Sequence, residues 1–143
     1  MKNLKKKKKN KSNAIETIIT KALLQLGFSP ANNGFYYLRD AVKLAYFDSE
    51  AITLITKLIY APIAKEYNTS GDNIEKSIRK ASESVWAKNS NQSIAVLNNI
   101  YYFPEQRPEN KELISFFNFF ALRSFFSINN ADFLFFISIA LKY

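Results

Sequence analysis

Apolar residues recur at helical spacing along the first half of the chain. Between residues 15 and 26 the intervals are i, i+3, i+4, i+7, i+8 and i+11, which is one face of a helix: Ile15, Ile18, Ile19, Ala22, Leu23 and Leu26. Gly27 follows directly and predicts the end of this helix. Glu16 and Lys21 interrupt the apolar core that a signal peptide would need, so the pattern indicates an amphipathic helix of a folded domain.

Two further helices are predicted beyond a loop at residues 30–34. The first ends near Asp48, and its buried stripe consists of Tyr37, Leu38, Ala41, Val42 and Ala45. The second uses Ile52, Ile55, Leu58 and Ile59, and Pro62 either kinks it or occupies the first turn of a new helix. No alternating strand pattern or hairpin turn appears, so the sequence predicts an all-α fold.

Residues 62–80 predict two helices around a short polar turn. Ile63, Ala64 and Tyr67 lie at helical spacing in the first helix, and Asn68 suits the left-handed conformation that ends a helix. The second helix is expected to begin at Asp72, which forms a capping box with Glu75, and Ser70 is the alternative N-cap. Its inward stripe is Ile74, Ile78, Ala81 and Val85, with Trp86 closing the core.

The outward face of this second helix is charged and amide-rich. It carries Asn73, Glu75, Lys76, Arg79 and Lys80, and Thr69 and Ser70 lie in the turn before it. Asparagine pairs with adenine, glutamate accepts from cytosine, and lysine and arginine donate to guanine or to phosphate. The pattern is therefore typical of a helix-turn-helix that reads DNA, although a charged face that is merely solvated has the same periodicity.

Composition narrows the possible functions. A chain of 143 residues fits one domain with a single core. It contains no cysteine and no histidine, which excludes a disulfide framework, a thiolate zinc site, a cysteine nucleophile and the usual general base at neutral pH. Asp48 and Glu50 form a loop pair with no third ligand near in sequence. We expect no catalytic site, no metal and no cofactor, and a cytoplasmic location.

The net charge of +8 is concentrated at the start of the chain. Seven lysines occupy positions 2, 5–9 and 11, and the remaining 13 Lys and Arg residues stand against 12 Asp and Glu. Residues 1–13 are therefore expected to form a Lys-rich disordered arm. Two interpretations stay open, a solvated tail or an arm that binds nucleic acid or an anionic membrane surface through counterion release.

The run from Gly34 to Ser90 resembles the C-terminal DNA-binding domain of the sporulation stage-zero response regulator. The likeness covers roughly residues 15–114, and the start of the family's last helix matches Arg107-Pro108 and residues 110–114. The other matching pieces are Gly34, Tyr36, Tyr37-Leu38-Arg39, Ile55-Thr56-Lys57, Tyr60, Ile63-Ala64-Lys65, Asn68-Thr69, Ile74-Glu75, Ile78-Arg79 and Trp86. The resemblance implies a compact bundle of about six helices over residues 14–126, with a recognition helix at residues 72–86 inserted in the major groove.

The resemblance also implies particular readout residues. The family's glutamate on the recognition helix falls on Glu75, and its later arginine falls on Arg79. Two other arginines of the family fall on Asn73 and Lys76. Losing a bidentate guanidinium should weaken or retarget base readout by roughly 1 to 3 kcal/mol per contact. We therefore expect DNA binding with an operator that differs from the family's.

Two departures from the family concern the ends of the chain. The Lys-rich arm stands where full-length members carry a phosphorylated receiver domain, so control through such a domain is not expected.

At the other end, nine phenylalanines lie between residues 116 and 136, and a helix over residues 112–126 would be apolar on nearly every side. The run Phe133–Leu141 spans nine residues, far fewer than the roughly 20 needed to cross a bilayer. Residues 127–143 are expected to form an apolar tail that folds back on the core, dimerises, touches a membrane or is a decayed end.

Together these patterns predict a non-enzymatic, sequence-specific regulator that binds double-stranded DNA. Family members act as tandem pairs and touch the RNA polymerase sigma factor, so a homodimer or tandem dimer on DNA and a sigma-factor contact are expected. The alternative is a receiver-less interaction protein that pairs with, or competes against, a full-length regulator or the polymerase.

Overall fold

The computed structural model describes residues 2–88 and 106–126 of the chain. Within these ranges every regular element is helical and no strand occurs, which confirms the all-α prediction. The five α-helices are α1 (Lys2–Leu26), α2 (Asn33–Phe47), α3 (Ala61–Glu66), α4 (Gly71–Lys88) and α6 (Asn110–Phe126). A 3₁₀-helix at Ala51–Leu54 and a π-helix at Thr56–Tyr60 connect α2 to α3.

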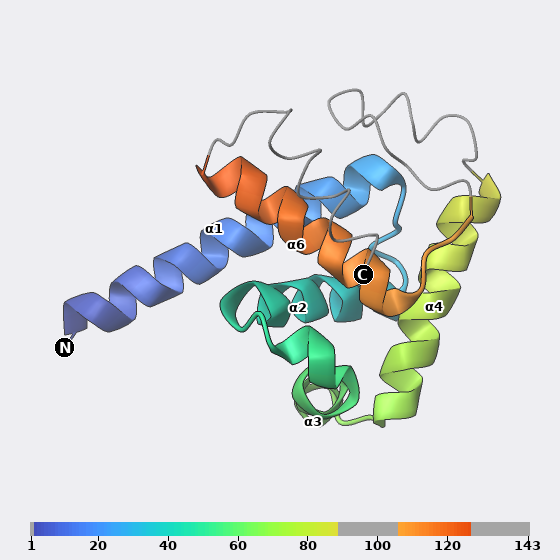
Figure 1. Cartoon of the computed structure of the whole chain (residues 1–143), viewed down its shortest axis with the longest axis horizontal. Helices are drawn as coiled ribbons and strands as arrows, with labels where there is room; N and C mark the ends of the chain where they lie inside the picture. The colour runs from blue at the N-terminus through green and yellow to red at the C-terminus, as the bar shows by residue number, and fades with distance from the viewer. Residues whose placement is uncertain (1, 89–105, 127–143) are drawn as a thin grey trace.

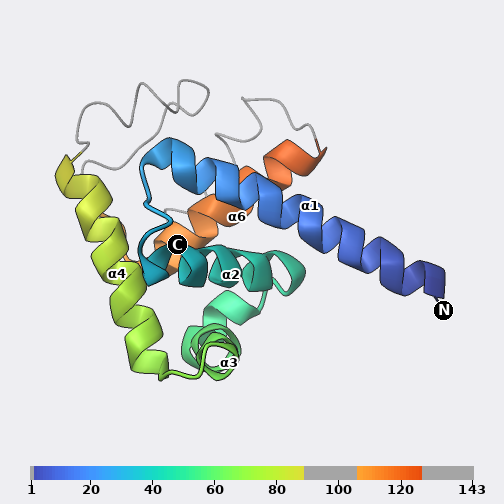
Figure 2. The ribbon, with the colours of Figure 1, turned by 180° about the vertical axis from the view of Figure 1, so that it is seen from behind.

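Helix α2 lies at the centre of the bundle. It packs against α1, α4 and α6, and its residues Leu38, Ala41 and Val42 are fully buried. Figure 1 shows α6 crossing the bundle near α1 and α2, with α3 below α2 and α4 along one side. In Figures 1 and 2 the free end of α1 and helix α4 lie at opposite ends of the longest axis of the molecule.

The packed half of α1 confirms the predicted apolar stripe. Ile15, Ile19 and Leu23 are buried, and Ile18 is partly buried against the same core. Gly27 has a φ of 94°, which lets the Phe28 N–H donate to the Leu23 carbonyl at 3.0 Å. This left-handed glycine ends the helix as predicted.

The first turns of α1 differ from the sequence-based expectation. Residues 2–13, for which the sequence suggests a disordered arm, continue the helix in the structure. Lysine has a high helix propensity, and the packed turns that begin at Ile15 provide a nucleus onto which further turns add at low cost. All side chains from residue 3 to residue 11 are exposed.

The segment before α3 is less regular than predicted. Instead of one helix through Ile52, Ile55 and Leu58, it forms a 3₁₀ turn followed by a π turn, and α3 then begins with Pro62 in its first turn. Proline has no N–H to donate to the Leu58 carbonyl, and its ring crowds that oxygen, so the wider turn before it has a physical cause. Of the two options for Pro62, the structure supports the first-turn position.

Helix α6 confirms the predicted aromatic helix, which begins at Asn110. Leu113, Ile114, Phe116 and Phe117 are buried, and the Phe117 ring lies edge-on to Phe28 with 6.0 Å between centroids. The phenylalanines at the start of the aromatic run therefore belong to the core. The aromatic loop at residues 101–103 and the tail at residues 127–143 lie outside the described residues.

Candidate nucleic-acid interface

The turn between α3 and α4 is fixed by its own backbone. Asn68 has a φ of 53° and is the only described residue other than glycine in the left-handed region, as predicted. This conformation lets the Thr69 N–H donate to the Ala64 carbonyl at 2.9 Å, while Asn68 N–H reaches Lys65 at 3.4 Å. The two bonds form the Schellman arrangement that ends a helix sharply, so the chain turns directly into α4.

Ser70 caps α4. Its Oγ accepts a hydrogen bond from the Asn73 N–H at 3.1 Å, and its carbonyl accepts from the Ile74 N–H at 3.1 Å. The helix therefore begins at Gly71, and the expected capping box between Asp72 and Glu75 is wrong. Ser70 is the N-cap because its short side chain reaches the third helical N–H, whereas Asp72 already lies inside the first turn.

The structure divides α4 into two faces, as the sequence predicts. Ile74, Ile78, Ala81 and Val85 are buried, and Trp86 packs partly buried against the same core. The seven candidate DNA-binding residues lie in the turn and on the outward side. Ser70, Asn73, Lys76 and Lys80 are exposed, and Thr69, Glu75 and Arg79 are partly exposed. Their contact with DNA stays a prediction.

Glu75 and Arg79 form an ion pair on the edge of this face. Arg79 Nη1 lies 3.2 Å from Glu75 Oε1, and Arg79 Nε lies 3.9 Å from Glu83 Oε1. The Arg79 side chain is 40% exposed, so an i,i+4 pair of this kind contributes only about 0.3–0.5 kcal/mol. A bidentate base contact is worth roughly 1 to 3 kcal/mol, which is enough to draw the guanidinium away from its carboxylates.

Asn73 is held by the turn. Its Nδ2 donates to Thr69 Oγ1 at 2.9 Å, in an exposed position. This bond points the amide toward the start of α4, where Ser70 and Thr69 also present hydroxyl groups. The three side chains thus form a neutral, hydrogen-bonding start to a face that becomes cationic at Lys76 and Lys80.

The start of α6 fixes the back of α4. Asn110 Nδ2 donates to the Glu75 carbonyl at 3.0 Å and to the Tyr60 hydroxyl at 3.2 Å. Arg107 Nη1 donates to Ser82 Oγ at 3.3 Å, and Ser82, fully buried, donates to the Arg79 carbonyl at 2.9 Å. Burial raises the pKa of Tyr60 despite its bond with Asn110. These contacts hold the two turns of α4 that carry Glu75 and Arg79.

A close approach of α2 and α4 sets the position of the helix. A Cβ atom on Gly34 would lie 2.3 Å from the Ser77 carbonyl oxygen and 2.8 Å from the Ala81 Cβ. Only glycine leaves room for this crossing. Beside it, a hollow of about 420 Å³ opens between the start of α2 and α4 and is lined by Asn33, Ser77 and Lys80.

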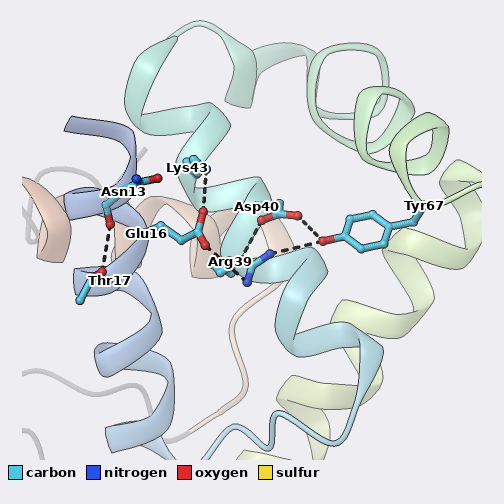
Figure 3. A network of polar contacts seen from close by, with 7 residues as sticks. All are labelled: Asn13, Glu16, Thr17, Arg39, Asp40, Lys43 and Tyr67. Atoms are coloured by element: carbon cyan, nitrogen blue, oxygen red, sulfur yellow. Dashed lines mark hydrogen bonds and ion pairs between the residues drawn. The ribbon is translucent and has the colours of Figure 1, made fainter. Parts of the chain in front are cut away.

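A polar network ties the turn to α2 and α1 (Figure 3). The Tyr67 hydroxyl donates to Asp40 Oδ2 at 2.6 Å, and Arg39 Nε donates to Asp40 Oδ1 at 2.9 Å. Arg39 Nη1 lies 3.7 Å from Glu16 Oε1, and Lys43 Nζ donates to Glu16 Oε2 at 2.7 Å. The network therefore links α1 to the end of α3 through α2.

The charges of the network shift its pKa values. Burial raises the pKa of Tyr67, and the hydrogen bond and negative charge of Asp40 raise it further. The hydrogen bond from Lys43 lowers the pKa of Glu16. Burial opposes the charged form of Arg39, but the hydrogen bond and charge of Asp40 outweigh it and raise the pKa of that guanidinium. Tyr67 is therefore a neutral donor and Glu16 a carboxylate at neutral pH.

Sequence reasoning missed several of these positioning residues. Tyr67 was identified only as an apolar contact of its helix, and Ser82 not at all, although a serine among the apolar residues of an inward stripe signals a buried hydrogen bond. Asn110 and Arg107 are far from α4 in sequence, so no local pattern relates them to it.

Two features are absent from the described residues, a cluster that could hold a metal ion and a membrane span. In the ranges 2–88 and 106–126, no three Asp or Glu side chains gather in an arrangement that could hold a metal ion. None of the helices in this part of the chain combines the length and apolar character that a membrane crossing requires.

An α-helical bundle whose α3, tight turn and α4 present a charged helix outward belongs to the helix-turn-helix class. Residues 19–118 match the family model described as sporulation initiation factor Spo0A C terminal. The match spans most of the chain, and the protein belongs to this family, as the resemblance implied. It is thus a DNA-binding domain of the sporulation transcription-regulator type and not a member of an enzyme family.

Proposed function

We propose that the protein binds a short operator in double-stranded DNA sequence-specifically, with α4 in the major groove. Glu75 and Arg79 read base edges, Asn73 contacts an adenine, and Lys76 and Lys80 bind phosphates together with the hydroxyls of Thr69 and Ser70. The observation that carries the proposal is the division of α4. Its inward stripe is locked into the core, while its outward side presents these groups in a single run of turns.

The weak pairing of the readout groups supports this role. The Glu75–Arg79 pair costs about 0.3–0.5 kcal/mol to open, whereas the backbone beneath it is fixed by Asn110 and Ser82. A readout helix needs this combination, because the side chains must rearrange onto bases while the helix keeps its place.

The operator is proposed to differ from that of relatives with arginine at both departing positions. Asn73 offers an amide that pairs bidentately with adenine, and Lys76 is a point charge without the fork geometry that selects guanine. Glu75 and Arg79 keep the family's chemistry. The protein is therefore expected to retain part of the family-type box, to shift its preference at the base below Asn73 and to lose discrimination at the base below Lys76.

We propose that the protein acts in the cytoplasm, where its duplex target lies, as a tandem pair on DNA that touches the RNA polymerase sigma factor. The rival function, an interaction protein working through its aromatic C-terminus, receives no support from the described residues. Phe116 and Phe117 are buried within the core and are not free for a partner.

The proposal is tested by mobility shift of the whole chain on a family-type box and on a shuffled duplex, at two salt concentrations. Lys76→Ala should weaken binding to both duplexes by a similar factor and reduce the salt slope by about 1. Lys21→Ala removes another exposed lysine, on α1, and serves as the matched control, which should leave both values unchanged. Equal affinity of the unaltered protein for both duplexes would overturn sequence-specific recognition.

A further inference from the structure

Helix α1 is much longer than its packed part. Residues from Ile15 onward contact the core, whereas residues 2–13 form a helical projection that we call the basic extension. Leu4 is its only large apolar side chain and is 65% exposed. In Figure 1 the extension leaves the bundle at the end opposite α4.

The basic extension is electrostatically unfavourable as an isolated helix. Lys5 and Lys9, like Lys7 and Lys11, are i,i+4 neighbours of equal charge, which destabilises a helix. The first turn contains no acidic residue, so the positive end of the helix dipole also faces positive side chains. A helix of this composition gains stability from a row of negative charges along it.

The lysines of the extension divide between two faces. At 100° per residue, Lys5 and Lys8 lie about five full turns before the buried residues Leu23 and Leu26 and share their side of the helix, and Lys11 lies about one turn before Ile15. Lys11 Nζ lies 6.0 Å from the centre of the Tyr46 ring, so this face turns toward the body. Lys6, Lys7 and Lys9 lie on the other side of the helix, away from the body, and are exposed.

We propose that the basic extension binds, as a helix, the phosphates of double-stranded DNA flanking the segment under α4, through Lys6, Lys7 and Lys9. This inference rests on the proposed function, in which the protein binds a DNA duplex. The extension leaves the bundle at the end opposite α4, so it can meet the duplex only outside the segment under α4, and its length of about 18 Å matches about five base pairs. A membrane surface is a poorer fit, because an interfacial helix needs an apolar face and this one has Leu4 alone.

The test uses the whole chain and two duplexes with the same central box. The short duplex ends at the edges of the box, and the long one continues for about ten base pairs on each side, about twice the length of the extension. The matched variants are Lys6→Gln/Lys7→Gln/Lys9→Gln and Lys5→Gln/Lys8→Gln/Lys11→Gln. Both remove three charges and keep a good helix former, so they differ only in the face they change.

On the long duplex, the first variant should make the plot of log affinity against log salt shallower by about 3, at about 0.9 for each lost phosphate contact. The second variant should change it by less than about 1. On the short duplex neither variant should alter the slope. Far-UV circular dichroism should show that both variants keep at least the helix content of the unaltered protein, so that a smaller slope reflects lost phosphate contacts and not lost helix.

Equal changes of the salt slope in the two variants would overturn the proposal, because the extension would then bind as an unstructured polycation and not through one face of a helix. Equal effects on the short and long duplexes would also overturn it, as would vesicles of anionic phospholipid that displace the long duplex from the extension. The ratio of affinities for boxed and shuffled DNA should be unchanged in both variants. If the unaltered protein binds boxed and shuffled DNA with equal affinity, sequence recognition by α4 is contradicted. The difference in salt slope between the long and the short duplex then still tests the extension by itself.

Discussion

Gly34→Ala tests whether the crossing of α2 and α4 positions α4, the proposed readout helix. The new methyl group would meet the Ser77 carbonyl oxygen at 2.3 Å and the Ala81 Cβ at 2.8 Å. The first of these is a backbone atom, so no side-chain rotation relieves the contact. The two helices must separate, and α4 must move relative to the contacts of Asn110 and Ser82 behind it.

The expected magnitude follows from two opposing effects. Overpacking a close contact costs about 1–3 kcal/mol, and replacing glycine by alanine within a helix returns up to about 1 kcal/mol. We therefore expect a net loss of about 1–2 kcal/mol in the free energy of unfolding. Because α4 shifts, the folded variant should also lose about tenfold in affinity for its box, equivalent to one misaligned base contact.

Urea unfolding and anisotropy titration of boxed DNA measure the two effects. Gly71→Ala is the matched control, since a Cβ at Gly71 meets only the Tyr60 Cβ at 3.8 Å. This control should be neutral or stabilise by about 0.4–1 kcal/mol and bind DNA normally. If Gly34→Ala is as stable as the control and binds the box equally well, then α4 does not depend on the crossing and the reasoning is refuted.

Three further predictions concern the residues that hold the turn and the network. Ser70→Ala should lower the free energy of unfolding by about 1 kcal/mol, because it removes the cap on the Asn73 N–H, whereas Asp72→Ala should lower it less. Equal losses of the two variants in urea melts would show that Asp72 contributes as much to capping as Ser70. Tyr67→Phe should lower the free energy of unfolding by about 1 kcal/mol, because it removes the hydroxyl that donates to Asp40, and Tyr36→Phe should lower it less. Equal thermal stability of the two variants would contradict the stabilising role of the network. Lys43 lowers the pKa of Glu16 below its ordinary value of 4.5, so the stability it provides is present above that pH and is lost as the pH falls through the lowered value. Urea midpoints measured through this range should therefore fall less in Glu16→Gln than in the unaltered protein, and identical profiles would count against the pairing.

Local periodicity predicted the parts of the fold that depend on neighbouring residues. The stripe from Ile15 to Leu26, the stop at Gly27, the left-handed Asn68 and the two faces of α4 all follow from the spacing or conformational preference of residues close in sequence. The same spacing brought the seven candidate DNA-binding residues to the turn and the outward side of α4.

The rest depends on contacts that a local pattern does not contain. The Asp72 cap was wrong because two adjacent polar residues compete, and only the geometry of the Schellman turn decides for Ser70. The π turn before Pro62 results from a clash over four residues, and the bonds from Asn110 to Glu75 and from Tyr67 to Asp40 span 35 and 27 positions. The need for glycine at position 34 becomes visible only when α4 is placed beside it.

The central claim is that α4 reads base edges through Arg79. Its most direct test is the affinity of Arg79→Ala and of the unaltered protein for duplexes that carry each of the four base pairs at every position of the box. The account predicts that Arg79→Ala loses discrimination at one position by roughly 1 to 3 kcal/mol and keeps it at the others. A uniform weakening at every position, or unchanged discrimination throughout, would contradict it.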